Sequence, residues 1–215
     1  MLGRFASLQL GLLCFGVGIP LMLQAHLGLP PWDVLHQGIS RHTPLTIGQA
    51  NEAAGFAVLL VAWAMGSRPG VGTISNMLLI GLWVDLVLRS GWLPDEAGGP
   101  LALRLAMLAL ALLLFGIGSG AYIAPRLGAG PRDSLMLMAA ARSRRPVALV
   151  RGAIESTACL AGVLLGGTVG VGTLITALLL GPAVHAGLRI FGFHLPAREP
   201  GEEPDSVAEP HVEGL

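Results

Sequence analysis

The chain consists of two halves that repeat each other at an offset of one hundred residues. The segment LGLPPWDVL at residues 27–35 returns as LGAGPRDSL at residues 127–135, and GVGT at residues 70–73 returns at residues 170–173. A repeat of this length is too long for a solenoid unit and is about the size of half a membrane transporter. The duplication therefore limits the possible folds more than any single motif does.

Composition places this duplicated chain in a membrane. Hydrophobic residues make up 53% of it, charged residues only 12%, and the mean hydropathy is +0.70. These values are outside the range that is typical of soluble globular domains. A run of about 20 apolar residues crosses the hydrocarbon layer of a bilayer, so the sequence predicts an all-α polytopic protein with three spans in each repeat. The predicted spans are approximately residues 6–24, 46–65, 72–90, 101–123, 147–167 and 171–193. The first is interpreted as a retained span rather than a signal peptide, because its counterpart lies in mid-chain.

We expect three regions: residues 1–95 as the first repeat, 96–195 as the second and 196–215 as a disordered tail. The tail carries six of the thirteen acidic residues, which is typical of a solvated segment. An odd number of spans per repeat predicts that the halves have opposite orientations. The connection at residues 124–146 holds five arginines and its counterpart holds only Arg41. By the positive-inside rule this places both termini in the cytoplasm of a bacterial plasma membrane.

A short polar segment follows the first span of each repeat, at Asp33–His42 and Asp133–Arg142. Each is too short to cross and is predicted to be a half-helix, because proline and aspartate favour the first turn of a helix. The two aspartates are interpreted primarily as helix caps. The alternative is that both half-helices direct their positive ends into one cavity, where Arg132 would favour an anionic group. Trp32, at the position of Arg132 in the other half, is interpreted as an interfacial anchor.

Glycines are predicted to have two structural roles, in turns between helices and in close contacts between helices. The GVGT segments are predicted to be tight turns that join the second and third spans of each repeat as hairpins, with the threonine capping the next helix. Gly116 and Gly120, like Gly162 and Gly166, have the small-xxx-small spacing that allows close helix contact.

The paired signatures resemble those of a known family. LGLPPWDVLHQGI with GVGT in the first half, and LGAGPRDSL, RGAIE at residues 151–155 and GGTVGVGT in the second, are similar to the YczE/YyaS/YitT family of bacterial membrane proteins. The resemblance runs from about residue 10 to 190. It implies a multi-spanning plasma-membrane protein and carries over no substrate or mechanism.

Ionisable residues inside spans are costly and need an explanation. Asp85 and His185 occupy equivalent positions and are candidates for binding or relaying a proton, or else they snorkel near helix ends. Arg151 and Glu155 lie four residues apart and can pair on one face, in a structural or a substrate-binding role. Glu52 follows two polar residues in a patch that the second half does not copy.

No motif for nucleotide binding, no nucleophile with a base, and no cluster of metal ligands is present in the sequence. We therefore expect no enzymatic activity, no cofactor, no metal and no nucleic-acid partner. The leading hypothesis is a secondary transporter or permease, export included, for an unidentified small organic molecule in the lipid bilayer. The alternative is a scaffold or regulator that acts through its cytoplasmic loop and tail. A homo-oligomer is compatible with either.

Overall fold

The computed structural model describes residues 1–192, which form helices joined by short loops. The predicted tail lies outside these residues. The helices are α1 (Leu2–Ala25), α2 (Pro31–His42), α3 (Ile47–Ala64), α4 (Val71–Arg89), α5 (Leu101–Ile123), α6 (Pro131–Ser143), α7 (Val147–Leu164) and α8 (Val171–Ile190). Six of these, all but α2 and α6, are long and apolar enough to cross a membrane. The all-α prediction with six spans and two intervening short helices is confirmed for this part of the chain.

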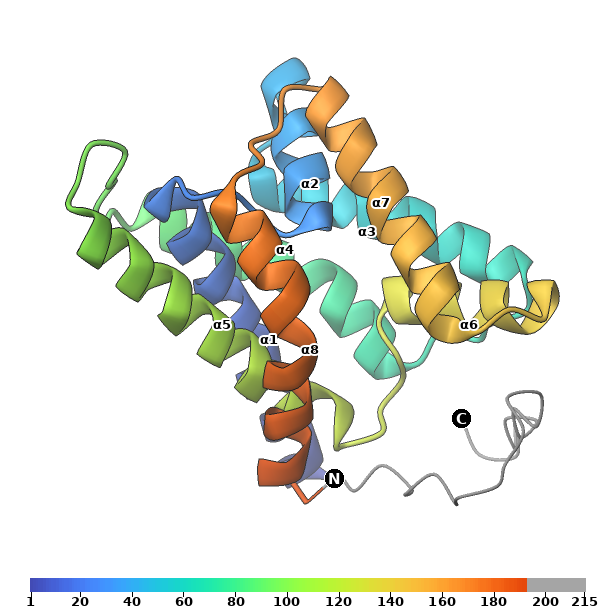
Figure 1. The fold of residues 1–215 in the computed structure, drawn as a ribbon. Helices are drawn as coiled ribbons and strands as arrows, with labels where there is room; N and C mark the ends of the chain where they lie inside the picture. Colours follow the sequence, from blue (N-terminus) through green and yellow to red (C-terminus); the bar gives the residue numbers. More distant parts are fainter. Residues whose placement is uncertain (193–215) are drawn as a thin grey trace.

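The helices form two groups (Figure 1). We call α1, α4, α5 and α8 the core bundle, since α1 packs against α4 and α5, and α5 against α8. The flanking bundle is α2, α3, α6 and α7, in which α2 packs against α7 and α3, and α6 against α3 and α7. Each bundle therefore takes two helices from each half of the sequence. The halves are interlocked rather than being separate compact domains.

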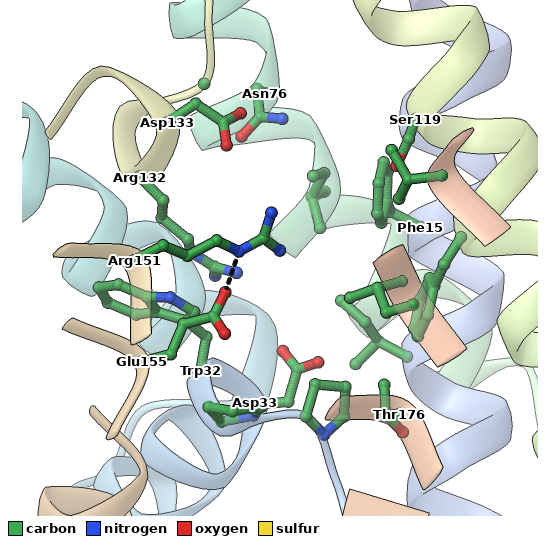
Figure 2. A pocket seen from close by; sticks show the side chains of 18 of the residues that line it. Phe15, Trp32, Asp33, Asn76, Ser119, Arg132, Asp133, Arg151, Glu155 and Thr176 are labelled. Atoms are coloured by element: carbon green, nitrogen blue, oxygen red, sulfur yellow. Dashed lines mark hydrogen bonds and ion pairs between the residues drawn. The ribbon is translucent and has the colours of Figure 1, made fainter. Parts of the chain in front are cut away.

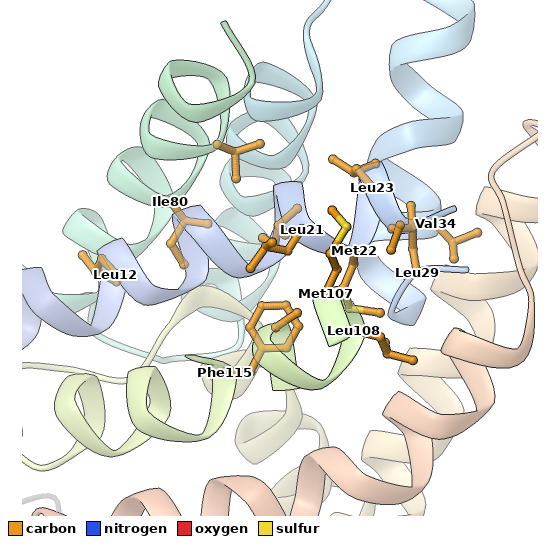
Figure 3. Packing of buried hydrophobic residues seen from close by; sticks show 14 of the residues in the cluster. Leu12, Leu21, Met22, Leu23, Leu29, Val34, Ile80, Met107, Leu108 and Phe115 are labelled. Atoms are coloured by element: carbon orange, nitrogen blue, oxygen red, sulfur yellow. The ribbon is translucent and has the colours of Figure 1, made fainter. Parts of the chain in front are cut away.

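The equivalent helices α1 and α5 lie side by side in opposite directions. The Ser7 hydroxyl near the start of α1 donates to the Ala121 carbonyl near the end of α5, at 2.8 Å. At the other end, Arg104 Nε donates to the Ala25 carbonyl at 2.7 Å. Midway, the rings of Phe15 and Phe115 stack with centroids 5.6 Å apart. This antiparallel pair forms the centre of the hydrophobic core (Figure 3).

The two repeated motifs bind each other across the halves. Gly172 N–H donates to the Leu27 carbonyl at 2.6 Å, and Gly72 N–H donates to the Leu127 carbonyl at 2.7 Å. Gly28 and Gly128 have φ values of 107° and 117°, which only glycine adopts readily. These positions direct the chain out of α1 and α5 and into the short helices. The threonine hydroxyls of both GVGT segments accept the N–H of the first glycine, Gly70 or Gly170. The threonines therefore lie in the first turn of α4 and α8, and the N-cap residues are the glycines.

The two bundles meet closely along one seam. In the α3–α4 seam Gly48 and Gly81 lie so close that a Cβ on either would overlap the other's carbonyl oxygen. The Asp85 carboxylate accepts hydrogen bonds from the Thr46 hydroxyl and, at 3.0 Å, from Gly48 N–H. Asp85 on α4 thereby provides an acceptor for a backbone N–H of the first turn of α3, which has no partner within its own helix.

The equivalent seam in the second half is open. From their connecting turn, α7 and α8 diverge rather than pack along their length (Figure 1), so the predicted hairpin is wrong for this pair. Ala148 stands at the position of Gly48 and carries the Cβ that glycine lacks, and the space around Gly181 is empty where a Cβ would lie. Pro146 and His185 stand where the other seam has its threonine and its aspartate. The second half therefore lacks most of the residues that bring α3 and α4 together.

Candidate functional site

A cavity of about 450 Å³ lies between the core bundle and the flanking bundle. This volume is within the range of small-molecule sites, about 300–1,000 Å³. Equivalent positions of the two halves face each other across it. The pairs that line it include Phe15 and Phe115, Trp32 and Arg132, Asp33 and Asp133, Asn51 and Arg151, Asn76 and Thr176, and Ile80 and Leu180. Equivalent positions of the two halves therefore share one cavity.

The walls of the cavity differ in chemistry (Figure 2). The flanking bundle contributes every charged lining residue within residues 1–192: Asp33, Arg132, Asp133, Arg151 and Glu155. The core bundle contributes a mainly apolar wall that includes the stacked rings of Phe15 and Phe115. A ligand between the bundles would therefore meet ionic groups on one side and aromatic and aliphatic groups on the other.

A buried polar network crosses the halves at the polar wall. Asp33 and His36 from α2 and Asn51 from α3 are 4%, 1% and 6% exposed. The Arg132 guanidinium from α6 donates to Asn51 Oδ1 at 2.7 Å and lies 3.1 Å from His36 Nε2. Because a guanidinium only donates, His36 Nε2 is the acceptor. The proton is then on Nδ1, which donates to Asp33 Oδ1 at 3.1 Å.

His36 is neutral in this arrangement. Burial lowers its pKa, while the hydrogen bond to Asp33 opposes that effect. Arg132 also stacks over the Trp32 ring, with its Cζ 4.8 Å from the ring centroid. That contact places Trp32 at the cavity, in contrast to the predicted interfacial anchor. Arg132 is thus held by an imidazole, an amide and an indole at once.

Asp133 lies at the end of the cavity opposite Asp33, beside Asn76 (Figure 2). Its Oδ2 accepts a hydrogen bond from the Tyr122 hydroxyl at 3.3 Å, and that hydroxyl in turn accepts the N–H of Gly130. Burial raises the pKa of Asp133, and the Tyr122 hydroxyl and the charges of Arg151 and Arg132 oppose that effect. Asp133 therefore favours the protonated form more than an exposed aspartate does.

Arg151 and Glu155 form the predicted pair on α7. Arg151 Nε lies 2.8 Å from Glu155 Oε1, and the side chains are 47% and 30% exposed. The pair projects into the cavity from the α7 wall (Figure 2). It is the most accessible charged pair lining the cavity and lies beside the open α7–α8 seam.

The interpretation of Asp33 and Asp133 as helix caps stays a prediction. Both lie in the first turn, after Pro31 and Pro131 at the helix starts, although the N-cap residues Pro30 and Gly130 make no side-chain cap hydrogen bond. The Asp133 carboxylate accepts from the Gly130 N–H at the start of α6, and the two carboxylates also contact His36 and Tyr122. The alternative arrangement, two helix starts at one cavity, is present as well.

The remaining predicted site residues do not line this cavity. Asp85 holds the start of α3, and Glu52 packs in the same α3–α4 seam, where a Cβ on Gly81 would lie 2.7 Å from its Cγ. His185 is exposed on α8. The structure does not bring Asp85 and His185 together.

Sequence reasoning missed His36, Asn51 and Tyr122 as members of the site. Their offset partners are Met136, Arg151 and Met22, so a change from apolar to polar between the halves was the available signal for His36 and Tyr122. Among residues 1–192, no group of three or more potential ligands could hold a metal ion.

Comparison with known proteins places the chain among uncharacterised membrane proteins. A profile of the family of unknown function DUF6198 matches residues 2–188. An uncharacterized protein of Haemophilus influenzae is 36% identical over 177 residues, covering 81% of this chain and 78% of the relative. The uncharacterized membrane protein YczE of Bacillus subtilis is 36% identical over 175 residues, covering 79% and 77%. YyaS of the same organism is 28% identical over 197 residues, covering 89% and 95%. No solved structure matches the chain.

Proposed function

The chain belongs to the family of unknown function DUF6198 and is similar to YczE and YyaS, and from its site we propose that it is a secondary transporter or permease for a small organic molecule. That it is an integral membrane protein follows from the six apolar helices and from its relative's description as a membrane protein. The observation that carries the transport proposal is a cavity lined by equivalent positions of the two repeats, with the α3–α4 seam packed and the α7–α8 seam open.

The repeats are inverted in the membrane in this proposal. Three observations support the inversion: α1 and α5 are antiparallel, the GVGT turns bind reciprocally across the halves, and the cavity is lined by equivalent pairs. Inverted repeats with interrupted helices beside a central site are the architecture of many secondary transporters.

Transport would then proceed by rocking of the flanking bundle against the core bundle. In this proposal the structure represents the state in which the α3–α4 seam is closed and the α7–α8 seam is open. With both termini in the cytoplasm, as the arginines predict, the start of α7 and the end of α8 lie on the cytoplasmic side. The open seam then faces the cytoplasm. The opposite state would close α7 on α8 and separate Gly48 from Gly81.

The direct test is flux in proteoliposomes that contain purified protein. We expect uptake or efflux of at least one member of a broad panel of metabolites and organic ions, measured with and without a proton gradient. No flux for any member would contradict transport. If deleting residues 196–215 abolished the activity of the protein in cells while cavity variants did not, the scaffold alternative would replace the transport proposal.

Replacing Arg151 with glutamine should separate activity from stability. The pair with Glu155 is partly exposed and contributes about 0.5 kcal/mol or less to folding, so thermal unfolding in detergent should hardly change. Flux should change at least about tenfold, equivalent to about 1.4 kcal/mol, because the Glu155 carboxylate loses its partner and alters the charge that the transported molecule meets.

The matched control is Arg89→Gln, at the exposed end of α4 and away from the cavity; it should leave both flux and unfolding unchanged. Unchanged flux in the Arg151 variant would remove the pair from the transport site.

A further inference from the structure

The charges that line the cavity do not balance. Within residues 1–192 they comprise two arginines, Arg132 and Arg151, and three carboxylates, Asp33, Asp133 and Glu155. His36 adds no positive charge, because its Nε2 accepts from Arg132. One carboxylate is therefore in excess of the available cations. An uncompensated charge at membrane depth costs several kcal/mol, so the excess requires either a proton or a bound cation.

Asp133 is the carboxylate in excess. Asp33 is bonded to His36 within the Arg132 network, and Glu155 pairs with Arg151. Asp133 accepts hydrogen bonds only from neutral donors among the described residues, the Tyr122 hydroxyl and the Gly130 N–H. The groups that face it are Tyr122 from α5, Asn76 from α4, and the charges of Arg132 and Arg151 from α6 and α7. Its carboxylate lines the same space that a ligand would occupy.

The opposite wall indicates what kind of cation would fit. The core bundle presents Phe15 and Phe115, stacked with centroids 5.6 Å apart, together with Ile19, Ile80 and Leu180. Aromatic faces attract organic cations, and an apolar wall favours a hydrophobic body. An inorganic cation has no apolar body and would gain nothing from the aliphatic part of this wall.

We propose, on the basis of the transport function above, that the cavity takes a monovalent organic cation with an apolar body in exchange for the proton held at Asp133. When the cation enters, the O–H bond of the Asp133 carboxyl breaks and its proton leaves to water through the open seam. The total charge of the cavity is then unchanged. When the cation leaves, Asp133 takes up a proton again. One site thus couples the flux of an organic cation to an opposing flux of protons.

The test is calorimetric binding of tetraphenylphosphonium to the purified protein in detergent, corrected for protein-free micelles. Its comparison ligand is tetraphenylborate, which has nearly the same shape and the opposite charge. We expect the cation to bind more tightly as the pH rises from about 5.5 to about 8. Its dissociation constant should fall by up to tenfold per pH unit over the range in which Asp133 is protonated in the free protein. Titrations in two buffers with different ionisation enthalpies should show proton release on binding.

Asp133→Asn mimics the protonated form and keeps an acceptor for Tyr122. Its binding of the cation should be weaker at high pH and independent of pH. The control Asp95→Asn, in an exposed loop, should behave as the unaltered protein. Tighter binding of tetraphenylborate, cation binding that does not depend on pH, or an Asp133→Asn variant that keeps the pH dependence would each overturn the proposal.

The outcomes also separate this inference from the transport function. Proton-linked binding of the cation without flux in proteoliposomes would support the site and contradict transport. Flux of an anion or zwitterion by a protein that does not bind the cation would support transport and overturn the cation site.

Discussion

Replacing Gly28 with alanine should unfold the protein or destabilise it by about 3 kcal/mol or more. Two effects add at this position. The φ of 107° is strained for any residue with a Cβ, and that Cβ would lie 2.5 Å from Gly170 N and 2.7 Å from Thr173 Oγ1. The clash falls on backbone at the junction between the halves, where neither side can move away. Thermal unfolding in detergent, followed by circular dichroism, measures the loss.

The control is Gly66→Ala. Gly66 also has a positive φ, 95°, but a Cβ there would meet nothing within 4 Å. Its substitution should cost only the backbone strain, about 1–2 kcal/mol. Equal losses in the two variants would mean that the contact between Gly28 and the second GVGT turn contributes nothing.

Replacing Arg132 with methionine should destabilise the protein by about 3 kcal/mol, and it should abolish flux. Without the guanidinium, His36 Nε2 and Asn51 Oδ1 lose their donor, and the buried Asp33 carboxylate loses its nearby positive charge. Removing one partner from a buried ionic network costs about 3–5 kcal/mol, and methionine recovers part of this by filling the space. Urea or thermal unfolding and the proteoliposome assay measure the two effects.

Arg142→Met is the matched control, because Arg142 lies on the same helix but is exposed in its last turn. This substitution should lower the free energy of unfolding by well under about 1 kcal/mol, and the flux should be unchanged. A stable Arg132→Met protein with normal flux would show that the network is neither structural nor functional.

Much of the fold could be predicted from the sequence because the apolar runs are long and the duplication checks each assignment. The half-helices at Pro31 and Pro131 could be placed from proline and aspartate alone, since these residues favour the first turn. The pairing of α1 with α5 and the reciprocal binding of Leu27 to Gly172 could not, because sequence patterns contain no information on which distant segments meet.

The cavity residues were only partly predictable for the same reason. Asp33, Arg132, Asp133, Arg151 and Glu155 stand out as charges in an apolar chain. His36 and Asn51 do not, because they act through Arg132, a residue of the other half. Asp85 was equally conspicuous, but its carboxylate is used by Thr46 and Gly48 across the α3–α4 seam. A charge in this apolar chain therefore indicated a polar contact, and only the structure showed which contact.

The most direct test of the central claim, that the two seams open alternately, is a pair of spin-label distances. Labels on cysteines at Ala153 and Ala186 report on the α7–α8 seam, and labels at the equivalent Ala53 and Leu86 report on the α3–α4 seam; all four positions are exposed. At rest the 153–186 distance should exceed the 53–86 distance. When a transported ligand or a change of pH drives the cycle, we expect the first distance to shorten while the second lengthens. Two distances that never change under any such condition would contradict the account.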